Sequence, residues 1–344
     1  MFSLSLYFPV ANFDMIKKMI LNEKYISVAP MMDWTDRHCR YFMRLINPDM
    51  HLFTEMIVAD SILHGDHKKL LSYDQSEHPI VLQLGGNDPL KMRRAAEIGA
   101  ESGFDEININ VGCPSDRVKS GSFGACLMAK PQIIADCVES IKKITDIPVS
   151  VKSRIGIDDQ DSYEFLYDFI KTISNCGCET FIIHARKAIL TGISPKQNLS
   201  IPPLNYDRVY RIKSDFNHLR IILNGGLNDI QDCINHLKVM DGIMIGRHAY
   251  RNPWFLNKIK RAIQHSDDHE VITRRDIVEK MYPYIEEQLK EGIKLKNITR
   301  HMLGLFSNQP GAKFWRSYIS QNSSKDKAGV EVLQNALDRM IEII

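Results

Sequence analysis

The sequence places one of its cysteines, Cys113, in a Gly-Cys-Pro turn, where a thiol can reach a bound molecule. Such a thiol can act as a nucleophile if a base or a cation lies beside it. It can also act as a general acid, because a thiol pKa of about 8.5 leaves the group protonated at neutral pH. A small buried turn residue is the alternative, which fits the other six cysteines better than Cys113.

Further residues that could do chemistry follow short apolar segments, one group at the end of each. They are Pro30-Met31-Met32, Glu55, Gln83, Asn110, Lys152, His184, Asn224-Gly225-Gly226 and Gly246-Arg247. Lys152 could stabilise a developing anion, such as the N1–O2 edge of a reduced flavin, and Gln83 offers an amide to a heterocycle. A solvated lysine, an ordinary turn glutamine and, for His184, a buried core histidine are the alternatives.

Two of these groups have the composition of a phosphate site. Gly225-Gly226 lets backbone N–H groups approach an anion, and a helix expected after Asp229 would direct its N-terminus to the same place. Gly246-Arg247 adds a second close approach and a guanidinium that can bind phosphate through two hydrogen bonds. Either pair alone could be a tight turn, whereas the two together favour a phosphate-bearing ligand.

Eight short apolar segments must carry these groups. They are residues 25–30, 51–54, 80–84, 106–110, 148–152, 180–184, 220–224 and 242–246. Amphipathic stretches such as 89–102 and 131–145 lie between them, with apolar residues at helical spacing. The pattern predicts an α/β fold, a closed parallel (β/α)8 TIM barrel whose functional groups lie at the C-terminal ends of the strands. A doubly wound open sheet is the runner-up, although no Gly-rich phosphate loop follows the first strand.

From about Phe255 onward, strand-like segments stop and helical patterns take over. The helical patterns cover residues 277–291, 298–306 and 329–344. We therefore predict three parts. They are an N-terminal extension at 1–24, a catalytic TIM barrel at 25–260 and an all-helical domain at 261–344.

Two basic clusters could contact a nucleic acid. One is the long segment 185–206, and loops of this length in compact domains are usually functional. Its cations are Arg186, Lys187 and Lys196. The other is Lys313 and Arg316 in the helical part, where cations beside aromatic residues suit phosphates and unstacked bases. The neighbouring Trp315 fits a hydrophobic core equally well.

The overall composition is that of a globular protein, with 344 residues, 44% hydrophobic, 25% charged and a net charge of +2. These values exclude disordered and fibrous classes, and the net charge indicates no polyanionic partner. The 7 cysteines lack zinc-type pairing, so no metal is expected, and scattered thiols suit a reducing cytosol. No run of about 18 apolar residues predicts a membrane span, and Lys17 and Lys18 follow the apolar N-terminus, which disfavours a signal peptide.

A series of motifs resembles one enzyme family, the bacterial tRNA-dihydrouridine synthases, over about residues 28–320. In chain order the motifs are VAPMMDWTDR, LFTEM, VLQLGG, ININVGCPS, VSVKSRIG, FIIHARKA, LNGGL and GRHAYRNPW. Four longer stretches further resemble the A subfamily, which acts at U20 and U20a of the tRNA D-loop. They are RHCRYFMR, GCPSDRVKSGSFGACLM, HARKAILTGISPKQN and MLGLFSNQPGAKFWR.

The resemblance implies a cytoplasmic flavin enzyme that reduces the uridine C5=C6 bond, with FMN in the barrel mouth and NADPH or NADH as reductant. Cys113 would be the catalytic acid and Asn110 would position the uracil. The FMN contacts would be Pro30, Met31, Met32, Gln83, Lys152, His184, Asn224, Gly225, Gly226, Gly246 and Arg247. The tRNA contacts would be Arg186, Lys187, Lys196, Lys313 and Arg316. We expect a monomer.

Three other functions remain open from the residues alone. An FMN barrel that reduces a free pyrimidine-like molecule would explain the barrel mouth but not the helical part. A phosphate-binding lyase would use Lys152 as a Schiff base and would be colourless. A non-catalytic RNA-binding module would leave the polar groups at the strand ends unexplained.

Overall fold

The computed structural model describes residues 24–115, 118, 120–264 and 272–343, and its first part is a closed parallel barrel. The barrel strands are β1 (Tyr25–Val28), β2 (His51–Phe53), β4 (Ile80–Gly85), β5 (Glu106–Val111), β6 (Val149–Arg154), β7 (Thr180–His184), β8 (Arg220–Asn224) and β9 (Gly242–Ile245). β1 pairs with both β2 and β9, and β2 pairs with β4, which closes the ring. The barrel and all eight predicted strands are confirmed.

One short strand was not predicted. β3 (Ile57–Val58) pairs with the C-terminal end of β4, whereas β2 pairs with the start of β4. β2 and β3 therefore cover the length of β4 together, and the interruption between them carries Thr54 and Glu55. Two residues are too few to show a strand pattern in the sequence.

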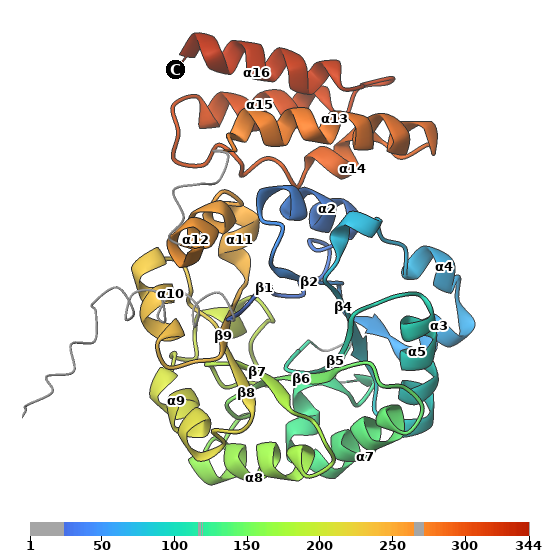
Figure 1. Ribbon diagram of the computed structural model, residues 1–344, viewed down its shortest axis with the longest axis vertical. Coiled ribbons are helices and arrows are strands. Elements are labelled where there is room, and N and C mark those ends of the chain that lie inside the picture. Colours follow the sequence, from blue (N-terminus) through green and yellow to red (C-terminus); the bar gives the residue numbers. More distant parts are fainter. Residues whose placement is uncertain (1–23, 116–117, 119, 265–271, 344) are drawn as a thin grey trace, which may run out of the picture.

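Helices surround the barrel, and a separate group of helices lies beyond one side of the ring (Figure 1). The first set is α2 (Arg37–Ile46), α3 (Ala59–His64), α4 (His67–Leu70), α5 (Pro89–Glu101), α7 (Pro131–Lys142), α8 (Tyr163–Ser174), α9 (Tyr206–Asp215), α10 (Ile230–Leu237), α11 (Arg247–Arg251) and α12 (Phe255–Gln264). Local sequence sets their starts, as at α5, where Pro89 is the first residue and Asp88 accepts hydrogen bonds from the next two N–H groups.

The interior of the barrel has an apolar part and a polar part. Phe53, Ile182, Ile222 and Met244 belong to a buried cluster inside the ring. Along β5, however, the side chains alternate between polar and apolar, and the polar ones lie in the interior. The expectation of apolar, non-alternating strands is therefore wrong for β5, and for β6, which has the sequence VSVKSR. The barrel accommodates β5 because neighbouring strands supply hydrogen-bond partners for each buried polar group.

The C-terminal part is entirely helical in the residues that the structure describes. Its helices are α13 (Arg274–Lys290), α14 (Leu295–Thr299), α15 (Ala312–Asn322) and α16 (Glu331–Ile343). The helix predicted at 298–306 is wrong, because α14 ends at Thr299 and turns follow, with Gly304 packed against the backbone oxygen of Arg251. The expected boundary after residue 260 falls inside α12, and the N-terminal extension lies outside the described residues up to residue 23.

Charged and aromatic contacts join the helical part to the barrel at α2. Asp36, the N-cap of α2, forms an ion pair with Arg300 and contacts His301, whose Nε2 lies 3.0 Å from Oδ1. Burial raises the pKa of Asp36, but the hydrogen bond and charge of His301, with other donors, bring that pKa below its usual range. Nδ1 of the neighbouring His38 forms a hydrogen bond of 2.7 Å with the hydroxyl of Tyr284 on α13. These contacts place the helical part beside the β1–α2 loop.

Candidate active site at the mouth of the barrel

The loop that carries Cys113 is fixed by backbone contacts. The side-chain oxygen of Asn110 accepts hydrogen bonds from the N–H groups of Gly112 at 3.1 Å and Cys113 at 3.0 Å. The carbonyl of Cys113 accepts from Ala125 at 2.9 Å, and Gly124 has φ +72° where a Cβ would lie 2.7 Å from that carbonyl oxygen. The half-buried Cys113 thiol therefore lies on an ordered turn at the C-terminal end of β5.

Two further buried amide side chains, those of Gln83 and Asn108, continue a line of hydrogen bonds from Asn110. Asn110 donates from Nδ2 to Oε1 of Gln83 at 2.8 Å, and Gln83 donates from Nε2 to Oδ1 of Asn108 at 2.7 Å. Gln83 is 1% exposed. Both ends of its amide thus contact protein groups, so its contact with a flavin ring stays a prediction.

Lys152 and Asn224 meet across the mouth. Nζ of Lys152 donates to Oδ1 of Asn224 at 3.3 Å, and Asn224 donates from Nδ2 to the carbonyl of Met244 at 2.7 Å. Burial, followed by the charge of Arg154, lowers the pKa of Lys152 to about 8, against a weaker opposite effect of Cys113. The residue is therefore a cation near neutral pH that a bound anion would stabilise.

His184 lies among positive charges. Burial lowers its pKa well below the usual value, and the charges of Arg154, Lys152, Arg186 and Arg247 act in the same direction. The imidazole is therefore neutral at physiological pH and can accept or donate a hydrogen bond without adding charge. A cluster of partly desolvated cations around a neutral ring suits an anionic ligand such as a phosphate.

The two glycine loops at the phosphate position differ in how much room they leave. Gly225 and Gly226 have φ of +112° and +74°, and a Cβ on Gly226 would lie 2.4 Å from the hydroxyl of Tyr206. At Gly246, by contrast, the nearest atom to an added Cβ is 3.9 Å away, so the protein leaves open space there. Arg247 opens α11 and donates to the carbonyl of Leu199 at 3.0 Å.

The β1–α2 loop supplies the apolar part of the mouth. Pro30 and Met31 are half-buried, and the Met31 N–H donates to Oγ1 of Thr35 at 2.9 Å. Met32 is 55% exposed, which is unusual for so large an apolar side chain. These three residues could cover one side of a planar ring.

Arg154 connects the loops, a role that the sequence did not predict. Its Nε donates to the carbonyl of Gly112 at 3.0 Å, and its Nη1 donates at 3.1 Å to the carbonyls of Lys187 and Asn198. The residue is 3% exposed, and burial lowers its pKa to about 10. Alternation of Ser150, Lys152 and Arg154 along β6, as on β5, was the signal that these side chains face inward.

The predicted tRNA contacts fall into two groups. Arg186 donates to the carbonyl of Pro202, and Lys187 forms an ion pair with Asp161 at 2.9 Å, so both already have protein partners. Exposed cations form the second group, Lys196 in the 185–206 loop and Lys313 and Arg316 on α15. Trp315 is 0% exposed and donates to the carbonyl of Met302, so it belongs to the core and is not a stacking platform.

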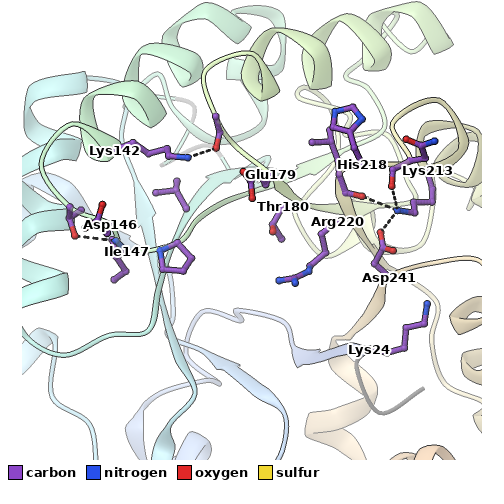
Figure 2. A pocket seen from close by; sticks show the side chains of 16 residues that line it. Lys24, Lys142, Asp146, Ile147, Glu179, Thr180, Lys213, His218, Arg220 and Asp241 are labelled. Atoms are coloured by element: carbon purple, nitrogen blue, oxygen red, sulfur yellow. Dashed lines mark hydrogen bonds and ion pairs between the residues drawn. The ribbon is translucent and has the colours of Figure 1, made fainter. Parts of the chain in front are cut away.

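A cavity of about 750 Å³ lies where the strands begin, at the end opposite this chemistry. Figure 2 shows the side chains that line it. Residues at the starts of β6, β7 and β8, among them Val149, Thr180 and Arg220, line it. Lys213 in its wall is paired with Asp241 at 2.7 Å. In the residues that the structure describes, no His, Cys, Asp and Glu cluster could hold a metal ion, and no helix could cross a membrane.

The parallel barrel, with polar groups gathered at the C-terminal ends of its strands, defines a (β/α)8-barrel enzyme. The chain belongs to the dihydrouridine synthase family, whose family model matches residues 27–342. This confirms the family indicated by the motifs.

Relatives named tRNA-dihydrouridine(20/20a) synthase resemble the chain over most of its length. The Vibrio vulnificus protein is 55% identical over 316 residues, which are 92% of this chain and 96% of that protein. The Escherichia coli K12 protein is 54% identical over 312 residues, 90% of each.

Solved structures share the fold at low sequence identity. Morphinone reductase matches with a TM-score of 0.51 and 10% identity, covering 70% of this chain and 86% of that one. A 2-naphthoyl-CoA reductase complex matches with a TM-score of 0.54 and 10% identity, covering 70% and 50%. At this identity the likeness concerns the fold alone.

Proposed function

We propose that the protein is a flavin-dependent tRNA-dihydrouridine synthase that reduces uridines at positions 20 and 20a of the tRNA D-loop. The relatives named for this activity include one that is 55% identical over 92% of the chain. The observation that carries the proposal is the turn that Asn110 holds above the barrel, with the Cys113 thiol at the end of β5.

FMN is the cofactor that the mouth fits. The open space at Gly246, the positive-φ turn at Gly225-Gly226 and the Arg247 guanidinium could receive its phosphate. His184 and Asn224 would contact the ribityl-phosphate portion, and Pro30, Met31, Met32 and Gln83 would contact the ring. Lys152 would lie at the N1–O2 edge, where a cation stabilises negative charge. NADPH, or NADH, is the proposed reductant.

The chemistry divides between the cofactor and the protein. When bound, reduced FMN would supply a hydride to C6 of the uracil, which would leave negative charge on C5 and the C4 carbonyl. The Cys113 thiol then donates a proton to C5, so that a C–H bond forms at each carbon and the C5=C6 double bond is lost. Asn110 would position the uracil, while its own side chain keeps the acid in place.

Substrate binding requires that the uridine leave the folded tRNA. Turning one base out of a loop costs a few kcal/mol, less than in a duplex. The C-terminal helical part would hold tRNA phosphates with Lys313 and Arg316 on α15. Arg186, Lys187 and Lys196 would do so from the barrel. A cytoplasmic monomer is proposed for the whole protein.

Mapping the product on tRNA tests the proposal. The purified protein should be yellow with bound FMN, and NADPH with an unmodified tRNA transcript should give dihydrouridine at positions 20 and 20a, located by sequencing. Reduction of free uracil or a uridine nucleotide in place of tRNA would support the small-molecule alternative. A colourless protein, or dihydrouridine formed only at other positions, would contradict the proposal.

A further inference from the structure

A line of hydrogen bonds runs through the barrel interior from the N-terminal end of β5 to the Cys113 turn. Glu106, at the start of β5, accepts at Oε1 from the Ser150 hydroxyl, and Ser150 accepts from Nδ2 of Asn108 at 2.8 Å. Asn108 in turn accepts from Gln83 at 2.7 Å, and Gln83 accepts from Asn110 at 2.8 Å. These side chains are all less than 9% exposed.

Each member of the line has its direction set by the member before it. A serine hydroxyl has a single hydrogen, so Ser150, which donates to Oε1 of Glu106, can only accept from Asn108. The carbonyl of Asn108 then faces the NH2 of Gln83, and the carbonyl of Gln83 faces the NH2 of Asn110. The oxygen of Asn110 is left facing the N–H groups of Gly112 and Cys113.

We infer that Glu106 is a positioning residue for Cys113, because its carboxylate fixes the direction of the hydrogen-bonded line that ends at Asn110. A reversed Asn110 amide would present NH2 to the N–H groups of Gly112 and Cys113, and the turn would have to move. This inference deepens the proposed function and rests on the role of Cys113 in it.

The Glu106 carboxyl group is buried, and each of its oxygens accepts a hydrogen bond. Burial raises its pKa above the usual value, while hydrogen bonds from Ser150 and Tyr25 and the charge of Arg220 act in the opposite direction. Tyr25 donates to the second oxygen, Oε2, at 3.1 Å. Arg220 lies at the wall of the cavity at this end (Figure 2). A buried carboxylate so far from the proposed chemistry is costly unless its acceptor role is used.

Three substitutions distinguish the effect of Glu106 on amide orientation from the effects of its volume and its charge. Glu106→Met keeps most of the volume but removes the acceptor, so the line loses its direction. Glu106→Gln keeps an amide oxygen that Ser150 can still donate to, with its NH2 toward the Tyr25 hydroxyl. Tyr25→Phe is the matched control, because it removes a hydrogen bond to the same carboxylate outside the line.

Two measurements on the FMN-bound protein test these variants, namely hydrogen exchange of the Cys113 turn and the rate of flavin oxidation. In Glu106→Met, hydrogen exchange in peptides that contain the Gly112 and Cys113 amides should be faster by about tenfold, as expected when a local hydrogen bond is broken. Oxidation of the reduced flavin by tRNA should slow by about tenfold or more, since small misplacements of a reacting group are costly. Reduction of the flavin by NADPH should be unchanged, and Glu106→Gln and Tyr25→Phe should stay near wild type.

Two results would overturn the inference. One is wild-type exchange and flavin oxidation in Glu106→Met, and the other is an equal loss in Glu106→Gln, which would assign the effect to charge. If Glu106→Met does not fold, Ser150→Ala breaks the same line one step nearer the mouth and must give the same two changes. Wild-type protein that forms no dihydrouridine would contradict the proposed function instead, and the exchange experiment would still decide the role of Glu106.

Discussion

Asn110 holds Cys113 from below, because its side-chain oxygen accepts the Cys113 N–H at 3.0 Å while its NH2 donates to Gln83 at 2.8 Å. The position of the thiol is thus set by the backbone of its turn and not by contacts of the sulfur alone. Sγ itself lies 3.4 Å from Oγ of Ser115. Removing the sulfur should therefore leave the turn in place.

Cys113→Ala should bind FMN and tRNA like the wild type but lose dihydrouridine formation by about 100-fold or more, the usual contribution of a general acid. Flavin absorbance, a tRNA binding titration and single-turnover product analysis measure the three properties. Cys126→Ala is the matched control, since Cys126 is a second half-buried cysteine on the adjoining segment. A Cys113→Ala enzyme with full activity would refute the assignment of the acid.

Gly226 and Gly246 should respond differently to alanine. Gly226→Ala forces a side chain into positive φ and to 2.4 Å from the Tyr206 hydroxyl, which should lower the free energy of unfolding by about 1–3 kcal/mol. Gly246→Ala should melt like the wild type, because 3.9 Å separates the new Cβ from Ala29. Its FMN affinity should nevertheless fall by about tenfold if a phosphate occupies that space. Unchanged affinity in a stable Gly246→Ala protein would remove Gly246 from the site.

Lys152 should make FMN binding depend on pH. Its pKa is lowered to about 8, so its charge is lost as pH rises through that value, and a bound anion shifts the change upward. Affinity, measured by quenching of FMN fluorescence, should therefore fall from about pH 7 to 9.5, where the FMN phosphate stays doubly charged. Lys152→Met should bind more weakly, with little change over the same range.

The same shift has a consequence for folding. The unfolded chain, with a lysine pKa of 10.5, binds more protons at this residue than the folded protein does above about pH 8. The contribution of Lys152 to the free energy of unfolding must therefore rise with pH between about pH 8 and the unfolded pKa of 10.5. Lys152→Met should remove that rise, and a pH dependence identical to wild type would show that the lysine is not desolvated.

The strands could be predicted from the sequence because a buried parallel strand is a local run of apolar residues that ends at a turn former. All eight predicted runs become barrel strands. The polar interior could not be derived in that way. The buried side chain of Asn108 donates a hydrogen bond to the Ser150 hydroxyl, and the two residues meet only because the register of β5 against β6 places them opposite each other.

Positions near the strand ends could also be predicted, since Lys152 lies on β6 and His184 ends β7. Their roles in binding a cofactor stay predictions. The alternation along β6 could have indicated that Arg154 faces inward, but its partners could not be predicted, because they are backbone carbonyls of distant loops. Trp315 was ambiguous for a related reason. Its burial results from the packing of α15 on the turns that contain Met302.

Lys313 and Arg316 provide the test of tRNA binding by the helical part. Both are exposed on α15 and lie three residues apart, so one face of the helix presents two charges. The double change Lys313→Ala and Arg316→Ala should weaken tRNA binding and reduce the slope of log affinity against log salt by about 2, one for each phosphate that the protein no longer neutralises. The control is Lys171→Ala, an exposed lysine on α8, across the barrel from the C-terminal helices (Figure 1). If the double variant and the control have the same salt slope as wild type, the α15 cations do not contact the tRNA phosphates, and the binding charge must lie elsewhere on the protein.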